Sequence, residues 1–202
     1  MTKRGCRAVA QVMLAVLCLG MAVSALAGEA KELFAAFLEK PGKESYLKVF
    51  AAVTSDKSYD PYSTDLDDAW DLVKEKKFRE ALEKLDKGMP NLLLSPRAHR
   101  FAAMAAHSLG NDDRAKVEFD IADKCAQGML ATGDGSADKP YLATRVSDEY
   151  DLLRHLKKMR KTQGLKHKDG KAFDVMQCAD GTEVWFDITV VFGSLSNKLK
   201  GT

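Results

Sequence analysis

Two aspartates near the C-terminus, Asp174 and Asp187, are the first candidates for chemistry in this 202-residue sequence. They flank Asp180-Gly181, and Asp-Gly between two extended apolar runs predicts a tight hairpin turn, because both central residues need positive φ. A turn centred on this dipeptide places the two carboxylates opposite each other, about 5 Å apart at Cβ, where like charges repel. A shared proton, a bound cation or a basic side chain such as Arg145 or Arg154 would offset that repulsion.

A shared proton would make this acidic pair a functional marker, because groups with a perturbed pKa gather at functional sites. We therefore predict that Asp174 and Asp187 mark whatever site the C-terminal half carries. Two alternatives stay open: an Arg or Lys bridge of purely structural role, or a different turn that shifts the register by one residue.

The sequence carries no motif that commits it to catalysis. His-Glu-x-x-His and Cys-x-x-Cys, which hold metals, are absent, and so are Gly-x-Ser-x-Gly and a phosphate-binding glycine loop. We therefore expect neither a metal nor a cofactor, and we predict that the protein is not an enzyme.

A further group of candidates depends on an internal repeat. Phe-x-x-Ala-Leu-x-x-Leu at 78–85 aligns with Asp-x-x-Ala-Lys-x-x-Phe at 112–119, and Ala69 aligns with Ala103 at the same spacing. This spacing matches the period of the tetratricopeptide repeat, about 34 residues, in which helix pairs stack and small residues let the backbones approach. A plain helical bundle is the alternative.

The resemblance to tetratricopeptide proteins implies a concave surface formed by the first helix of each pair. Trp70 and Met104 are separated by one such period and would face the same groove. We predict a groove that binds an extended, acidic peptide through Leu66, Trp70, Arg97, Arg100, Met104 and His107. In the alternative, Trp70 and Met104 are simply core residues.

The segment 1–27 has the features of a signal peptide. Lys3, Arg4 and Arg7 precede an apolar run over 8–23, and small residues at 25 and 27 complete an Ala-x-Ala cleavage site. The apolar run is shorter than the roughly 20 residues of a membrane span, although a retained anchor is the alternative. We predict a periplasmic or secreted protein with no membrane span after cleavage.

Composition narrows the class of partner. The chain has 31 basic and 29 acidic residues, and 46% of it is hydrophobic, which is typical of a globular protein. All of the excess positive charge lies in 1–27, so the remainder gives no reason to expect binding to nucleic acid. We predict another protein or a peptide as the partner.

Cys125 and Cys178 are the only cysteines beyond residue 27. Because export exposes them to an oxidising compartment, a disulfide between them is one prediction. It would close a loop of 53 positions, worth about 4 kcal/mol on the chain-entropy model. Two buried free thiols are the alternative.

The periodicity of apolar residues divides the chain into two parts. Helical spacing over 28–131 predicts tetratricopeptide-like hairpins, and 132–140, with two glycines before Pro140, predicts a linker. Residues 141–202 predict a small α+β unit with an antiparallel hairpin. The predicted fold class is therefore α+β.

Within 141–202 we expect a strand over 141–146, a helix capped by Ser147, and strands over 173–178 and 183–192. The basic run over 157–161 predicts a solvated helix end, with an acidic partner or a membrane surface as the alternative.

Four segments together resemble a known family. Tyr59-Asp60-Pro61-Tyr62, Gly133-Asp134-Gly135, Ser-Asp-Glu-Tyr-Asp-Leu-Leu-Arg at 147–154 and Trp-Phe-Asp-Ile at 185–188 are similar to exported bacterial proteins of the family named domain of unknown function 4919. The resemblance implies export and helices followed by an α+β unit, and it transfers no activity or catalytic residues to this chain. We predict an exported protein–protein interaction or scaffolding module; the alternative is a periplasmic enzyme with an acidic site at Asp174 and Asp187.

Overall fold

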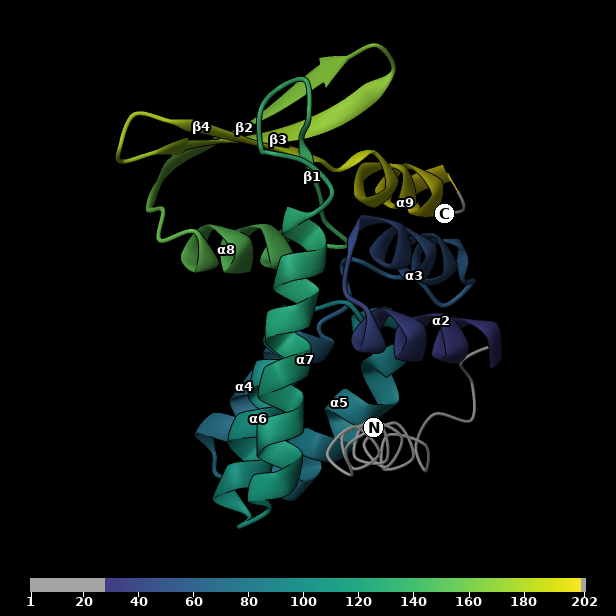
Figure 1. The fold of residues 1–202 in the computed structure, drawn as a ribbon, viewed down its shortest axis with the longest axis vertical. Coiled ribbons are helices and arrows are strands. Elements are labelled where there is room, and N and C mark those ends of the chain that lie inside the picture. The colour runs from purple at the N-terminus through teal and green to yellow at the C-terminus, as the bar shows by residue number, and fades with distance from the viewer. Residues whose placement is uncertain (1–27, 201–202) are drawn as a thin grey trace, which may run out of the picture.

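The helices of this computed structural model mostly precede its sheet along the chain (Figure 1). The structure describes residues 28–200, so the predicted signal peptide lies outside the described residues. In chain order the elements are α2 (Gly28–Glu39), α3 (Lys43–Ser55), α4 (Asp65–Lys74), α5 (Phe78–Leu92), α6 (Pro96–Ser108), α7 (Asp112–Leu130), β1 (Tyr141–Leu142), α8 (Val146–His155), β2 (Arg160–Lys168), β3 (Lys171–Cys178), β4 (Glu183–Asp187) and α9 (Thr189–Lys200). The predicted α+β fold is confirmed.

Two helical hairpins, α4–α5 and α6–α7, occupy the segment in which the sequence predicts a repeat. α5 begins at Phe78 and α7 at Asp112, the residues that open the two aligned segments, and α4 also contacts α6. Ala69 and Ala103 are fully buried, as expected where helix backbones approach closely. Leu85 is buried but Phe119 is 47% exposed, so the second hairpin departs from the repeat at that position.

The apolar core forms two clusters. One lies within the hairpins and draws mainly on α4, α5 and α6. The larger one joins α2, α3 and α7 to β1, α8, β3, β4 and α9, and thus continues across the predicted linker at 132–140. The two parts of the chain therefore share a core. Among the described residues, no helix is both long enough and apolar enough to cross a membrane.

The sheet has the strand order β1-β4-β3-β2, and its register differs from the predicted one. Asp174 pairs with Phe186, and Phe173 pairs with Asp187. The reason is the turn: the amide of Cys178 donates to the carbonyl of Thr182 at 2.8 Å, so the loop spans 179–181 and is one residue longer than the predicted turn. Only Gly181 in this loop has positive φ, at 84°.

The strand predicted over 183–192 ends at Asp187, and the residues from Thr189 onwards form α9 instead. Oδ1 of Asp187 accepts hydrogen bonds from N and Oγ1 of Thr189, at 3.0 and 2.6 Å, where the helix begins. Ile188 and Val191 are buried whereas Val190 is 39% exposed, which is helical spacing rather than alternation.

The basic run over 157–161 does not end a helix, as the sequence predicts, but leads into a strand. The chain turns at Lys157, which has φ of 55°, and β2 begins at Arg160. Leu165 is the only strongly apolar residue of β2, and it is half-exposed, so the alternation that reveals a strand in a sequence is missing.

The start of α8 also differs from the prediction. Arg145, in extended conformation, occupies the N-cap position predicted for Ser147, and the predicted strand over 141–146 shortens to β1. The hydroxyl of Thr144 donates to Oδ2 of Asp148 at 2.6 Å, so the first turn is bonded from a residue outside the helix. Oγ of Ser147 has no hydrogen-bond partner in the described part of the chain.

Candidate functional site

An exposed aromatic stack lies on α4 and α6, the first helices of the two hairpins. The ring of Trp70 stacks on that of Phe101 with 4.9 Å between centroids, and Trp70 remains 37% exposed. Met104, one helical turn after Phe101 on the same face, is 40% exposed. We call Trp70, Phe101 and Met104 the Trp70 patch. Leu66, predicted for this surface, is instead buried in the hairpin core.

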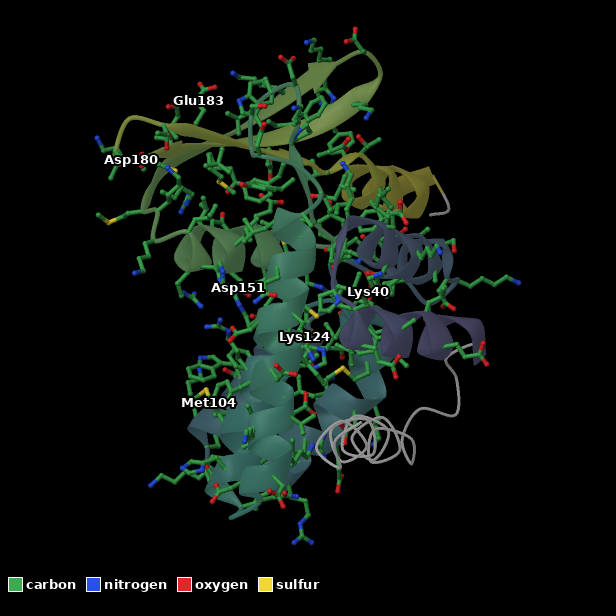
Figure 2. All side chains as sticks on the ribbon, viewed as in Figure 1. Lys40, Met104, Lys124, Asp151, Asp180 and Glu183 are labelled. Atoms are coloured by element: carbon green, nitrogen blue, oxygen red, sulfur yellow. The ribbon has the colours of Figure 1, made fainter. Side chains whose placement is uncertain are left out.

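Arg97, one of the two arginines predicted to line the groove, binds a carboxylate of the protein itself. Arg97 donates from Nε and a terminal nitrogen to the carboxylate of Asp151 on α8, at 3.1 and 2.9 Å, and thereby ties α6 to α8. Arg154 contacts the same carboxylate at 3.2 Å. Figure 2 shows Met104 and Asp151 along the same side of the molecule. Arg97 is therefore an internal anchor rather than a free peptide-binding residue.

Arg100 and His107 make weaker contacts. Arg100 reaches the exposed Asp123 at 3.3 Å, and its buried Nε has no hydrogen-bond partner among the described residues. His107 lies at the end of α6, is largely exposed and contacts Asp112 at 2.6 Å. Phe101 is absent from the predicted set, although its helical spacing from both Arg97 and Met104 places it on the same face.

Asp174 and Asp187 do not form the predicted pair. They lie on opposite faces of the sheet, because Asp174 shares a face with Phe186 whereas Asp187 shares one with Phe173. Asp187 binds Nζ of Lys171 at 3.1 Å, a contact that does not include Asp174. The one-residue shift of register accounts for the separation.

Asp174 instead faces Glu149 of α8. Glu149 is fully buried, and neither of its carboxyl oxygens has a hydrogen-bond partner among the described residues. Burial raises the pKa of Glu149 well above its ordinary value, and the charges of Asp174 and Asp148 raise it further. Burial also raises the pKa of Asp174. We call Glu149 and Asp174 the carboxyl pair.

The surroundings of the carboxyl pair are polar but contain few charges. Nε2 of Gln163 donates to Oδ2 of Asp174 at 2.6 Å, and the hydroxyl of Tyr150 donates to Oε1 of Gln163. Tyr62, which is 42% exposed, lies nearby: burial, then Asp174 and Glu149, raise its pKa. Its hydroxyl donates to the carbonyl of Val191 at 3.3 Å.

A buried polar network next to this pair fixes α8 to the loop over 56–64. The hydroxyl of Tyr59 donates to the carbonyl of Thr144 at 2.6 Å, and Arg145 donates to the carbonyl of Asn91 at 2.8 Å. Burial raises the pKa of Asp148, at the centre of the network, to about 6. Tyr59 of the Tyr-Asp-Pro-Tyr segment thus helps to position the residues that precede α8.

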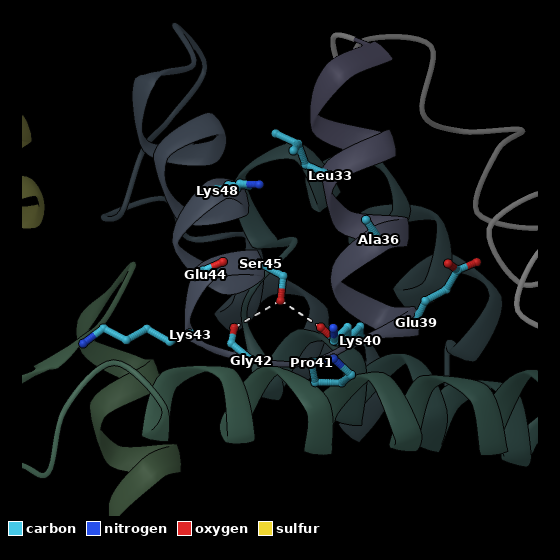
Figure 3. Close-up of a pocket in the computed structure, with 10 residues that line it drawn as sticks. All are labelled: Leu33, Ala36, Glu39, Lys40, Pro41, Gly42, Lys43, Glu44, Ser45 and Lys48. Atoms are coloured by element: carbon cyan, nitrogen blue, oxygen red, sulfur yellow. Dashed lines mark hydrogen bonds between the residues drawn. The ribbon is translucent and has the colours of Figure 1, made fainter.

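A hollow in the surface lies elsewhere on the molecule. It measures about 560 Å³ and is formed by α2, α3 and the turn between them, where the hydroxyl of Ser45 bonds the carbonyls of Lys40 and Gly42 (Figure 3). Its lining shares no residue with the Trp70 patch or the carboxyl pair. We therefore do not treat it as the functional site.

Cys125 and Cys178 are both free and buried, so the predicted disulfide is wrong. Each belongs to the larger apolar cluster, and burial raises the pKa of the Cys125 thiol well above its usual value. In the part of the chain that the structure describes, no three His, Cys, Asp or Glu side chains are grouped so as to hold a metal ion.

Comparison of the chain with family models, with curated proteins and with solved structures finds no match.

Proposed function

We propose that this protein is an exported protein–protein interaction module and that the Trp70 patch binds an extended, acidic segment of its partner. The observation that carries the proposal is the half-exposed Trp70 ring, stacked on Phe101 across two neighbouring helices. Tryptophan, tyrosine and arginine dominate the binding energy of protein interfaces, and more than a third of the surface of Trp70 remains accessible to a partner.

The preference for an acidic segment follows from Arg100. It lies one helical turn before Met104 on α6, and its contact with the exposed Asp123 is a surface ion pair of small energy. A carboxylate of a bound peptide can replace Asp123 at this guanidinium. Arg154, whose side chain is 63% exposed, provides a second positive group towards α8.

The Trp70 patch can be tested with a displayed library of random twelve-residue peptides. Selection on the mature protein should enrich acidic sequences, and Trp70→Ala should weaken their binding at least tenfold, about 1.4 kcal/mol. Phe119→Ala is the matched control, because Phe119 is an aromatic residue of similar exposure on α7. Equal binding of the selected peptides to wild type and Trp70→Ala would contradict the proposal.

Export has its own test. Protein recovered from the periplasm or the medium should begin at Gly28 on N-terminal sequencing, because cleavage is expected after Ala27. Retention of residues 1–27 on membrane-bound protein would contradict cleavage and support an anchor.

An enzyme remains the second candidate because of the carboxyl pair, whose raised pKa values are typical of acid–base groups. A catalytic acid must reach its substrate, however, and Glu149 is fully buried. We therefore favour the interaction module.

A further inference from the structure

The strand β2 lies at an open edge of the sheet. Among the described strands it pairs with β3 alone, and every residue along its length except Gln163 is exposed. In Figure 1 the β2–β3 hairpin projects from the end of the molecule opposite the α6–α7 turn. An edge strand keeps one row of backbone N–H and C=O groups available for another chain.

The hairpin is also the basic part of a chain that is otherwise slightly acidic. Residues 157–171 contain seven lysines and arginines and one acid, Asp169. Some of these cations have partners: Lys166 lies over the ring of Trp185 at 4.6 Å, and Lys171 contacts Asp187. Within the described structure Lys161 and Lys168 have no ion pair or ring contact, and Lys168 sits opposite Lys171 in the ladder.

Lysines on an edge strand discourage pairing with a second copy, because like charges would then face one another at about 5 Å. The same charges favour a strand that carries Asp or Glu. Leu165 and Met159, which are 50% and 71% exposed, add apolar surface at the same edge. A segment that carries Asp or Glu would therefore meet both opposite charge and apolar surface at this edge.

We propose that β2 binds an acidic, extended segment of another protein as a fifth strand of the sheet. Main-chain hydrogen bonds supply the pairing, and alternate acidic side chains meet the lysines. This site is separate from the Trp70 patch and does not depend on it.

The test uses a synthetic nine-residue peptide with glutamate at alternate positions and valine or threonine between them. Its comparison peptide has the same sequence with N-methyl groups on the amides of one edge, which keeps the charge but removes the donors. The first peptide should bind and slow hydrogen exchange at alternate amides of 160–168. The N-methylated peptide should bind at least tenfold more weakly.

Charge is tested with Lys161→Glu/Lys168→Glu, for which affinity should fall about tenfold or more at low salt. Lys43→Glu/Lys48→Glu is the matched control, since both lysines are exposed on α3 and the change in net charge is equal. Trp70→Ala should leave this binding unchanged. Equal affinity for the two peptides, absence of amide protection, or binding to anionic vesicles without binding to the peptide would each overturn the proposal.

Discussion

Replacing His99 with leucine should lower the free energy of unfolding by about 3 kcal/mol, because the buried carboxylate of Glu118 loses its short contact with His99 and keeps only the 3.4 Å contact with Arg114. His99 and Glu118 are buried between α6 and α7, with Nδ1 and Oε2 2.7 Å apart. Nε2 lies 3.0 Å from the carbonyl of Leu93. A carbonyl oxygen can only accept a hydrogen bond, so Nε2 of His99 carries a hydrogen. The contact between Nδ1 and Oε2 of Glu118 needs a second hydrogen, which lies between these two atoms. Leucine preserves most of the volume that packs on Phe34.

The second half of this experiment is His99→Leu/Glu118→Leu, measured by the same urea unfolding. Removing both polar groups should restore much of the lost stability, because an apolar replacement of a buried pair is often nearly neutral. Arg114 keeps Asp86, 2.6 Å away, as its partner in that variant. His107→Leu is the control, because the contact between His107 and Asp112 is exposed and should contribute almost nothing. A double variant no more stable than His99→Leu would contradict this account.

Glu149→Gln should make the protein less sensitive to rising pH. The pKa of Glu149 is raised in the folded state, so the folded protein holds a proton that the unfolded chain releases above its ordinary pKa. The stability that this proton contributes is complete below about pH 4.5 and is lost as pH rises towards the folded pKa. Relative to Glu149→Gln, the wild type should therefore lose up to about 1.4 kcal/mol per pH unit in that range.

The measurement is urea unfolding of both proteins between pH 5 and 9. The glutamine amide can also donate to Asp174, so the variant should be the more stable protein at the alkaline end. Glu183→Gln is the matched control, because Glu183 is exposed and hydrogen bonds from Trp185 and Gln177 lower its pKa. Its pH profile above pH 5 should parallel that of the wild type. Parallel profiles for Glu149→Gln and wild type would mean that Glu149 holds no such proton.

Local patterns in the sequence are sufficient to predict a helix or a strand where one of its faces is buried. The hairpins α4–α5 and α6–α7 follow from apolar residues at helical spacing and from the repeated small residues. β3 is predicted from a short run of mostly apolar residues that includes Phe173, Val175 and Met176, and the structure buries both faces of that run. The sequence does not predict β2, because an exposed edge strand needs no apolar alternation. It does not predict α9 either, because the consecutive β-branched residues over 188–191 favour a strand and tertiary packing overrides that preference.

The candidate sites depend on contacts between distant segments, which a sequence pattern does not contain. The loop over 179–181, longer than the predicted turn, shifts the hairpin by one position and separates Asp174 from Asp187. In the observed register Asp174 lies next to Glu149 instead. Glu149 is in the first turn of α8, where the sequence pattern predicts only an acid on the surface that the helix dipole favours. Arg97 is predicted to line a groove, but because α8 packs on α6, it forms an ion pair with Asp151 instead.

The sequence alone thus determined that helical hairpins precede a smaller α+β unit, because this depends on the spacing of apolar residues within one element. Tertiary structure decided the exposure of Trp70, which the sequence leaves open between groove and core. Tertiary structure alone decided which acids and arginines meet, because that depends on strand register and on helix packing. A shift of one residue changes the strand register, and a single side-chain contact can decide which partner an arginine on a packed helix meets. A one-residue change reverses the face of every side chain in a strand, and no local pattern records it.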